Sequence, residues 1–249
     1  MTAEDTTTGE GGLLVPIDLT ALTTSISRLD QVTSADDEPA ELLHRVLESA
    51  QSLFGLSGLG LMFVDENEAL RYVAATNSAV HALERAQEES GEGPCVDSLV
   101  LDEVVACEDL STDDRYRVVG RVVAEHGIRA VLGVPVRLGG AAVGTLNVHR
   151  DRPHLWDDSD ITAIRGFAGV IEAVLRTLLA AERHSRLSDQ LTYALEHRVV
   201  IERSIGYLMA RDGVDAVTAF DVLRRSSRSS RRKVGEVAAD VLAGKELPV

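Results

Sequence analysis

The spacing of apolar residues changes several times along the chain and separates helical from extended stretches. Apolar residues recur every three or four positions over residues 39–54 and 79–90, which predicts two amphipathic helices. Dense apolar runs bounded by polar residues predict strands at residues 59–65, 70–75, 103–110, 129–138 and 141–150. The last two runs are joined by Gly139-Gly140, a dipeptide typical of a tight hairpin turn. The pattern predicts a domain of mixed helices and strands.

A helical period returns after this domain and continues with few interruptions. It starts at Asp158, and no proline occurs between Ile161 and Arg211. This predicts one long helix, or two helices with a slight break near residues 184–188. A helix of that length is too long to bury its apolar stripe against one compact domain. We therefore expect it to pair with a second copy as a coiled coil, which makes the protein a homodimer.

The predicted seam of that coiled coil uses the apolar positions Ile164, Ile171 and Leu178. At the other end of the chain, residues 1–16 are polar and acidic, which predicts a disordered leader. Apolar spacing within residues 17–37 predicts a short N-terminal amphipathic helix.

Composition narrows the class of protein. No apolar run approaches the roughly 20 residues that a membrane span needs, and the acidic N-terminus lacks the features of a signal peptide. Two cysteines in 249 residues suit a reducing, cytoplasmic compartment better than a disulfide framework. We therefore expect a cytoplasmic protein without membrane contact.

Charge is distributed unevenly. The net charge is -15, but residues 185–249 hold eleven Lys or Arg and nine Asp or Glu, a net of +2, which leaves -17 for residues 1–184. Within residues 224–233 six cations occur with no carboxylate among them. They are Arg224, Arg225, Arg228, Arg231, Arg232 and Lys233. Such a cluster in an acidic chain suggests a polyanionic partner, with nucleic acid the expected one.

Helix capping strengthens this interpretation. Ser229 or Ser230 is a natural N-cap for the last helix, which places Arg231, Arg232 and Lys233 in its first turn. Cations there oppose the helix dipole, by ~0.3–1 kcal/mol each, and so favour a phosphate-binding role over a structural one.

Several segments, in this order, resemble a GAF domain. They are GEGPCVDSL, VACEDLSTDDRY, AEHGIRAVLGVPVRLGGAAVGTLNVHR and PHLWDDSDITAIRGFAGVIEAVL. The resemblance covers residues 38–181 and implies an α+β fold, with a central antiparallel sheet, flanking helices and a pocket for an unidentified small-molecule or redox signal. The composition singles out no cofactor.

Residues 182–249 resemble an ANTAR domain, a three-helix, all-α RNA-binding module of bacterial antiterminators. The matching positions are Ala194, Leu195, Arg198, Ile201, Glu202, Gly206, Leu208, Met209, Ala219, Phe220, Leu223, Arg224, Ser227, Arg232, Lys233, Val237 and Ala238. Ser204 and Ile205 depart from the Ala-Lys that the family commonly has, which removes one basic contact. The resemblance implies that an RNA stem-loop is the partner. Arg198 either contacts RNA or pairs with a carboxylate.

Three further features have open interpretations. Cys95 and Cys107 are either redox residues or small buried side chains, the commoner fate of a free cysteine. Gly206, within a predicted helix, indicates close approach of another helix or of a phosphate backbone. Tyr207 and Phe220 are interpreted as core residues.

Signals for other chemistry are weak. The histidines show no metal-ligand spacing, and no P-loop, nucleophile elbow or metalloprotease motif occurs, so no metal and no enzymatic activity are expected. We therefore predict a signal-responsive, RNA-binding transcription antitermination regulator. The alternative is a redox or small-molecule sensor that acts through protein–protein contacts, with the C-terminal helices as a dimerisation module.

Overall fold

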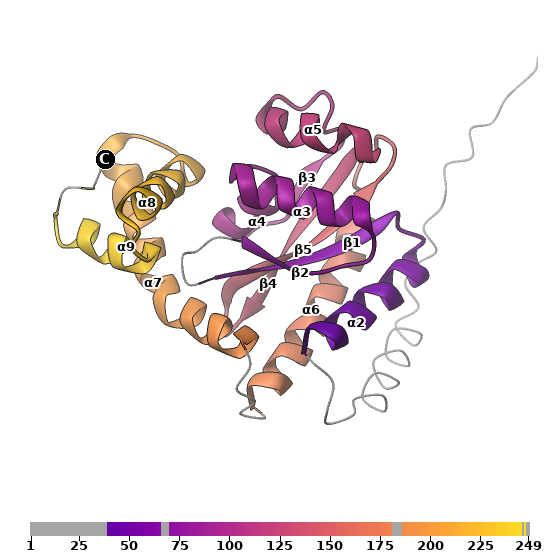
Figure 1. Ribbon diagram of the computed structural model, residues 1–249, viewed down its shortest axis with the longest axis horizontal. Coiled ribbons are helices and arrows are strands. Elements are labelled where there is room, and N and C mark those ends of the chain that lie inside the picture. The colour runs from indigo at the N-terminus through magenta and orange to yellow at the C-terminus, as the bar shows by residue number, and fades with distance from the viewer. Residues whose placement is uncertain (1–38, 66–69, 181–185, 246, 248–249) are drawn as a thin grey trace, which may run out of the picture.

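A five-stranded antiparallel sheet organises the first part of the chain in the computed structural model, which describes residues 39–65, 70–180, 186–245 and 247 (Figure 1). The strand order is β2-β1-β5-β4-β3. The strands are β1 (Gly58–Val64), β2 (Leu70–Ala75), β3 (Val105–Cys107), β4 (Ala130–Leu138) and β5 (Ala141–Arg150). The predicted α+β fold and its hairpin at Gly139-Gly140 are confirmed.

The central strands are buried on both faces because helices cover both sides of the sheet. All seven residues of β1 are buried, as the dense apolar run predicts. β4 and β5 form the expected hairpin, whose turn residues Gly139 and Gly140 have φ values of 58° and 87°. Positive φ at both positions is what a tight hairpin turn requires and what glycine supplies without strain.

Two pairs of helices sandwich the sheet. α2 (Pro39–Phe54) and α6 (Asp158–Ala180) pack together and against strands on one side, where the rings of Phe54 and Phe167 meet edge to face at 6.2 Å. α3 (Ser78–Ser90) and α4 (Pro94–Leu101) pack on the other side, and α5 (Arg117–Val123) lies beside α3 (Figure 1). Short 3-10 turns, η1 (Asp114–Tyr116) and η2 (Ala124–His126), flank α5.

α4 is a helix that the apolar pattern did not predict. It begins at Pro94, which suits a first helical position, directly after Gly93 at φ 136°. It lies so close to β4 that a Cβ on Gly133 would stand 2.8 Å from the Pro94 carbonyl oxygen. Glycine at position 133 therefore allows α4 to rest directly on the sheet.

The C-terminal part is the expected three-helix module, formed by α7 (Arg186–Asp212), α8 (Ala216–Ser230) and α9 (Val234–Leu242). All three pairs of these helices are in contact. Their buried apolar side chains belong to the same contiguous cluster as the core of the sheet domain. Those residues are Ile201, Ile205, Leu208, Ala219, Phe220, Leu223, Val234, Val237, Ala238 and Val241.

The single long helix is a wrong prediction, and the two-helix alternative holds. α6 ends at Ala180 and α7 begins at Arg186. α7 does not extend the line of α6 but runs along the α4 side of the sensor, where it contacts β1 and β5 (Figure 1). A helical period persists through both because each helix has its own apolar surface to cover.

The predicted coiled-coil seam is also wrong at two positions. Ile164 and Ile171 are buried in the core of a single chain, where α6 covers the sheet, and are not available to a second copy. The side chain of Leu178 lies outside the described residues, as do the predicted leader at residues 1–16 and the helix within residues 17–37. Dimerisation itself stays a prediction.

Candidate nucleic-acid interface

The basic cluster of residues 224–233 lies at the end of α8 and in its connection to α9. The N-cap prediction is wrong, because α8 continues through Ser230 and α9 begins only at Val234, with Lys233 as its N-cap. The Ser229 and Ser230 hydroxyls donate to the Ser226 carbonyl oxygen at 3.1 and 2.6 Å, so they bond back into their own helix.

This shift reverses the dipole argument. Arg231 has φ 53° and follows the last residue of α8, and the Arg232 amide donates to the Ser227 carbonyl at 3.1 Å. Cations at the carboxyl end of a helix are favourable, so Arg231 no longer opposes a helix dipole, and only Lys233, the N-cap of α9, still lies at the amino end of a helix. The interpretation of the cluster as a nucleic-acid-binding site therefore depends on its charge and its exposure.

Part of the cluster faces solvent. Arg225 is 67% exposed and pairs with Asp221 at 3.0 Å, and Arg231 is exposed. Arg232 pairs with Asp240 at 2.7 Å and with Glu236 at 3.5 Å. Lys233 is half-buried, and the side chain of Arg228 lies outside the described residues. Among the cluster side chains that the structure describes, those of Arg225 and Arg231 are the most open to a polyanion.

Arg198 and Arg224 are buried instead. Arg198 donates from Nε to Glu202 at 2.8 Å and from Nη2 to the Leu99 carbonyl at 3.0 Å. Arg224 donates from Nη1 to the Gly91 carbonyl at 3.1 Å, and its guanidinium lies 5.8 Å from the ring centroid of Phe220. Both arginines face the sheet domain. For Arg198, the alternative of a carboxylate pair is realised in this state.

An exposed face of α7 adds residues to the surface. Tyr207, interpreted from the sequence as core, is 43% exposed, whereas Phe220 is buried as expected. Arg211 lies 5.8 Å from the Tyr207 ring centroid, and Arg203 is exposed one turn before Tyr207. A Cβ on Gly206 would meet nothing within 4 Å among the described residues, so helix packing in this chain does not explain that glycine.

The sensor half contains a buried polar line beneath α3. Glu84 is fully buried and accepts two bonds from the Asn147 amide, at 2.8 and 3.0 Å. Burial raises the pKa of Glu84 to about 8, so the side chain is mainly a neutral acid at pH 7. Thr145 and His149 follow the same face of β5, and burial lowers the pKa of His149 to about 4.

Several atoms of this line have no hydrogen-bond partner among the described residues. They are Thr145 Oγ1, Asn147 Oδ1 and both ring nitrogens of His149. Glu84 restricts the space above Gly60, where a Cβ would stand 2.0 Å from its Oε1. Sequence reasoning missed the line, although Thr145, Asn147 and His149 alternate with apolar residues in a strand that is buried on both faces.

Neither cysteine has the environment of a reactive thiol. Cys95 is buried and its Sγ accepts a bond from Gln87 Nε2 at 2.8 Å, and burial raises its pKa well above the ordinary value. Burial and the neighbouring Asp113 raise the pKa of Cys107 to about 12. Thiolates are the reactive form, so this geometry gives no support to a redox role.

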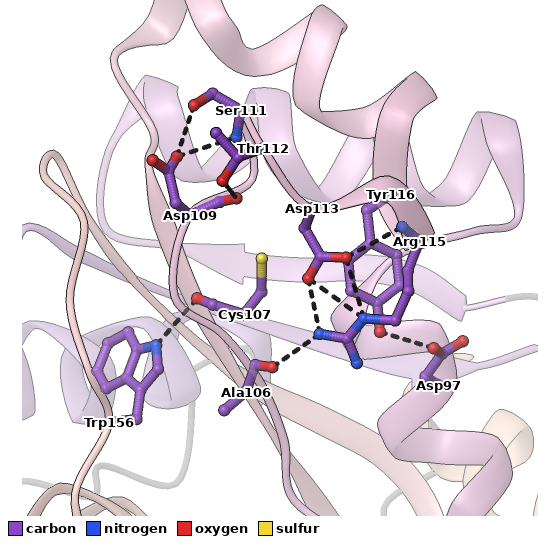
Figure 2. Close-up of polar contacts among 10 residues, drawn as sticks. All are labelled: Asp97, Ala106, Cys107, Asp109, Ser111, Thr112, Asp113, Arg115, Tyr116 and Trp156. Atoms are coloured by element: carbon purple, nitrogen blue, oxygen red, sulfur yellow. Dashed lines mark hydrogen bonds and ion pairs between the residues drawn. The ribbon is translucent and has the colours of Figure 1, made fainter.

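A polar cluster around β3 fixes the position of α4 (Figure 2). The Tyr116 hydroxyl donates to Asp97 of α4 at 2.7 Å. Arg115 bridges Asp113 and the Ala106 carbonyl, at 2.7 and 3.2 Å. Trp156 donates from Nε1 to the Cys107 carbonyl at 3.2 Å. These bonds join α4, β3 and the segment before α6 into one unit.

The described residues were also compared with what a metal site and a membrane-spanning helix require. No group of three or more His, Cys, Asp or Glu side chains in the described part of the chain is arranged to hold a metal ion. Among the described helices, none has the length and apolar character to cross a membrane.

Comparisons with known proteins agree with this architecture. A GAF domain model matches residues 38–175, and an ANTAR domain model matches residues 189–242. None of the curated proteins compared with the chain matches it.

Solved structures that resemble the chain include the GAF domain of a phosphoenolpyruvate-protein phosphotransferase from Coxiella burnetii, at a TM-score of 0.51 and 16% identity, covering 67% of this chain and 99% of that one. The corresponding GAF domain from Acinetobacter has a TM-score of 0.47 at 16% identity and covers 65% and 97%. The free methionine-R-sulfoxide reductase of Neisseria meningitidis has a TM-score of 0.48 at 15% identity and covers 65% and 93%.

At these identities the solved structures show the fold alone. The GAF match extends over more than half of the 249 residues, and the three-helix module follows it in the order that the sequence predicts. The chain belongs to the GAF-domain family and carries an ANTAR domain after its GAF domain.

Proposed function

We propose that this protein is a signal-responsive transcription antitermination regulator whose ANTAR domain binds stem-loop RNA under the control of its GAF domain. The order of a sensor domain and an RNA-binding domain supports this function in general terms. The single observation that carries the RNA-binding part is a set of exposed arginines on the ANTAR helices of a chain whose net charge is -15.

The residues proposed to bind RNA combine charge with an aromatic ring. Arg225 and Arg231 supply cations for phosphates, and Arg203 and Arg211 flank the exposed Tyr207 on α7. Protein side chains read RNA mainly in loops, where unpaired bases stack on aromatic rings and arginine planes. The open space above Gly206 lets a sugar-phosphate backbone approach α7 closely. These arginines and the exposed tyrosine suit an RNA stem with an open loop better than an RNA duplex without a loop.

The sensor is proposed to act without catalysis and as part of a homodimer. GAF and ANTAR domains are sensor and regulatory domains, the thiols are buried, and the burial that lowers the pKa of His149 makes it a weak base. The signal is proposed to be a small molecule that satisfies the unpartnered atoms of the Glu84 and Asn147 line.

Capture of crosslinked transcripts from the native cell tests the function, followed by binding assays with the captured stem-loop. Arg225→Ala should weaken binding about tenfold, because a hydrogen bond to a charged group contributes on the order of 1.5 kcal/mol. It should also reduce the slope of log K against log salt by roughly 0.7–0.9.

Arg85→Ala is the matched control. Arg85 is 70% exposed and pairs with Glu89 four residues away, as Arg225 pairs with Asp221. Both changes remove one charge and one helix ion pair, but only Arg225 belongs to the proposed surface. Equal effects of the two variants would refute the RNA surface. Captured proteins with no RNA would favour the alternative of a sensor acting through protein–protein contacts.

A further inference from the structure

Two arginines of the ANTAR domain are held by backbone carbonyls at the carboxyl ends of two successive sensor helices, α3 and α4. Arg224 of α8 donates to Gly91, which ends α3 just before α4 begins. Arg198 of α7 donates to Leu99, in the last turn of α4. These bonds span 133 and 99 residues of sequence, so they join separate domains.

The carbonyl groups that accept these two bonds lie at the carboxyl ends of helices. The last four carbonyls of a helix have no partner within it, and the helix dipole makes that end negative. Gly91 and Leu99 both lie at such ends, of α3 and α4. The two guanidiniums therefore bind acceptors that carry partial negative charge. RNA phosphates are also negative and are stronger acceptors than these carbonyls.

Apolar packing surrounds these bonds. α8 packs against α4, and α7 contacts β1 and β5. The buried apolar residues of the sensor and of the ANTAR helices form one contiguous cluster. Removal of the ANTAR helices from α4 therefore exposes apolar surface as well as two arginines, which makes docking a defined state of the chain.

We propose that the GAF domain holds the ANTAR domain in a docked state with low RNA affinity, in which the carboxyl ends of α3 and α4 withhold Arg224 and Arg198 from RNA. This inference rests on the proposed RNA-binding function and specifies its regulation. Undocking adds two cations to those already exposed at Arg225 and Arg231. Because only the undocked fraction uses the complete surface, docking weakens the apparent affinity for RNA in proportion.

The docked state is suited to release. Arg198 Nη1 is buried with no hydrogen-bond partner among the described residues, and its carboxylate partner Glu202 is 51% exposed. A buried guanidinium that is incompletely satisfied is costly, whereas phosphate accepts paired charge-assisted bonds. RNA therefore competes well for these side chains once α4 moves.

α4 is also placed to transmit a signal. It has no room to approach the sheet, because a Cβ on Gly133 would stand 2.8 Å from the Pro94 carbonyl oxygen. Gly133 is the register partner of Asn147, whose Oδ1 has no hydrogen-bond partner among the described residues. A molecule that bound beside Asn147 and displaced α4 would move the Leu99 carbonyl that holds Arg198.

Gly91→Ala in the full chain tests the docking from the sensor side. A Cβ on Gly91 would stand 2.5 Å from Arg224 Nη2, so the guanidinium has to leave its site. Gly127→Ala is the matched control, since the two glycines end helical segments at φ 74° and 71° but nothing lies within 4 Å of a Cβ at position 127. Both variants carry the same backbone strain, and only one displaces an arginine.

Two measurements are made on wild type and both variants. One is affinity for a fluorescent RNA with two tandem hairpins. The other is the rate at which phenylglyoxal modifies each arginine, followed by mass spectrometry. We expect Gly91→Ala to bind the RNA about five- to tenfold more tightly than wild type and to expose Arg224 to the reagent. Gly127→Ala should match wild type in both measurements.

Other outcomes separate the two hypotheses. Faster modification of Arg224 in Gly91→Ala with unchanged RNA affinity overturns the regulation and leaves the RNA-binding function intact. Wild-type Arg198 and Arg224 that react as fast as the exposed Arg225 overturn the docked state itself, without need of any variant. If no form of the protein binds RNA, even at low salt, the proposed function fails and the inference fails with it.

Discussion

The buried carboxyl of Glu84 predicts that the sensor domain loses stability above neutral pH. Burial raises its pKa from 4.5 to about 8, so the folded chain retains a proton that the unfolded chain releases. The free energy of unfolding therefore falls as the pH rises from 4.5 towards 8. His149 acts in the opposite sense, because burial lowers its pKa from 6.5 to about 4 and stability is lost as the pH falls through that window.

The pH ranges over which Glu84 and His149 titrate together determine how the stability of the sensor domain should depend on pH. Between pH 4.5 and 6.5 the two slopes oppose each other and largely cancel. Between pH 6.5 and 8 the contribution of His149 has ended and that of Glu84 continues, over about 1.5 pH units at roughly 1.4 kcal/mol per unit. Wild type should therefore lose on the order of 2 kcal/mol of stability across this range, and Glu84→Gln should not. The glutamine keeps the acceptor for Asn147 and adds a donor for the unpartnered Asn147 Oδ1.

Denaturant unfolding at pH 6.5 and pH 8 measures this difference. Trp156, the single tryptophan of the chain, is buried in the sensor domain and reports its unfolding by fluorescence. Glu89→Gln, an exposed position on the same helix α3, is the control and should keep the wild-type pH dependence. The reasoning is refuted if Glu84→Gln shows the same loss between pH 6.5 and 8 as wild type.

Two further predictions concern the thiols and the assembly. Burial raises the pKa of both thiols, so Cys95 and Cys107 should resist an aromatic disulfide reagent at pH 8 in the native protein and react fully in urea. Rapid labelling of either thiol in the native protein would support the redox role instead. Sedimentation at micromolar concentration should show a homodimer, and a monomer would refute the predicted assembly.

Local residue patterns were enough to predict most elements of the fold. The alternating and dense apolar runs located the strands, and the Gly139-Gly140 pair located the β4–β5 hairpin, because these signals depend on neighbours in sequence. α4 was missed because eight residues, Pro94–Leu101, with apolar side chains in most positions show no clear helical period.

The ends of the last two helices were misplaced for a related reason. Ser229 and Ser230 can cap a following helix or bond back into a preceding one, and a local pattern favours neither choice. Packing of α8 and α9 against α7 decides that α8 runs to Ser230. The sequence alone thus identified the cations correctly as a cluster but not their position relative to a helix dipole.

Composition and residue order by themselves determined that an acidic domain of mixed helices and strands is followed by a small helical module with a basic cluster, because apolar period and charge are properties of consecutive residues. Only the tertiary structure decided which cations are available. Arg198 and Arg224 look like the exposed arginines in sequence, but they meet the carbonyls of Leu99 and Gly91, about 100 residues or more away along the chain. Whether an arginine is buried, and which group it bonds to, depends on contacts between distant segments of the chain. These contacts arise only when the domains pack together.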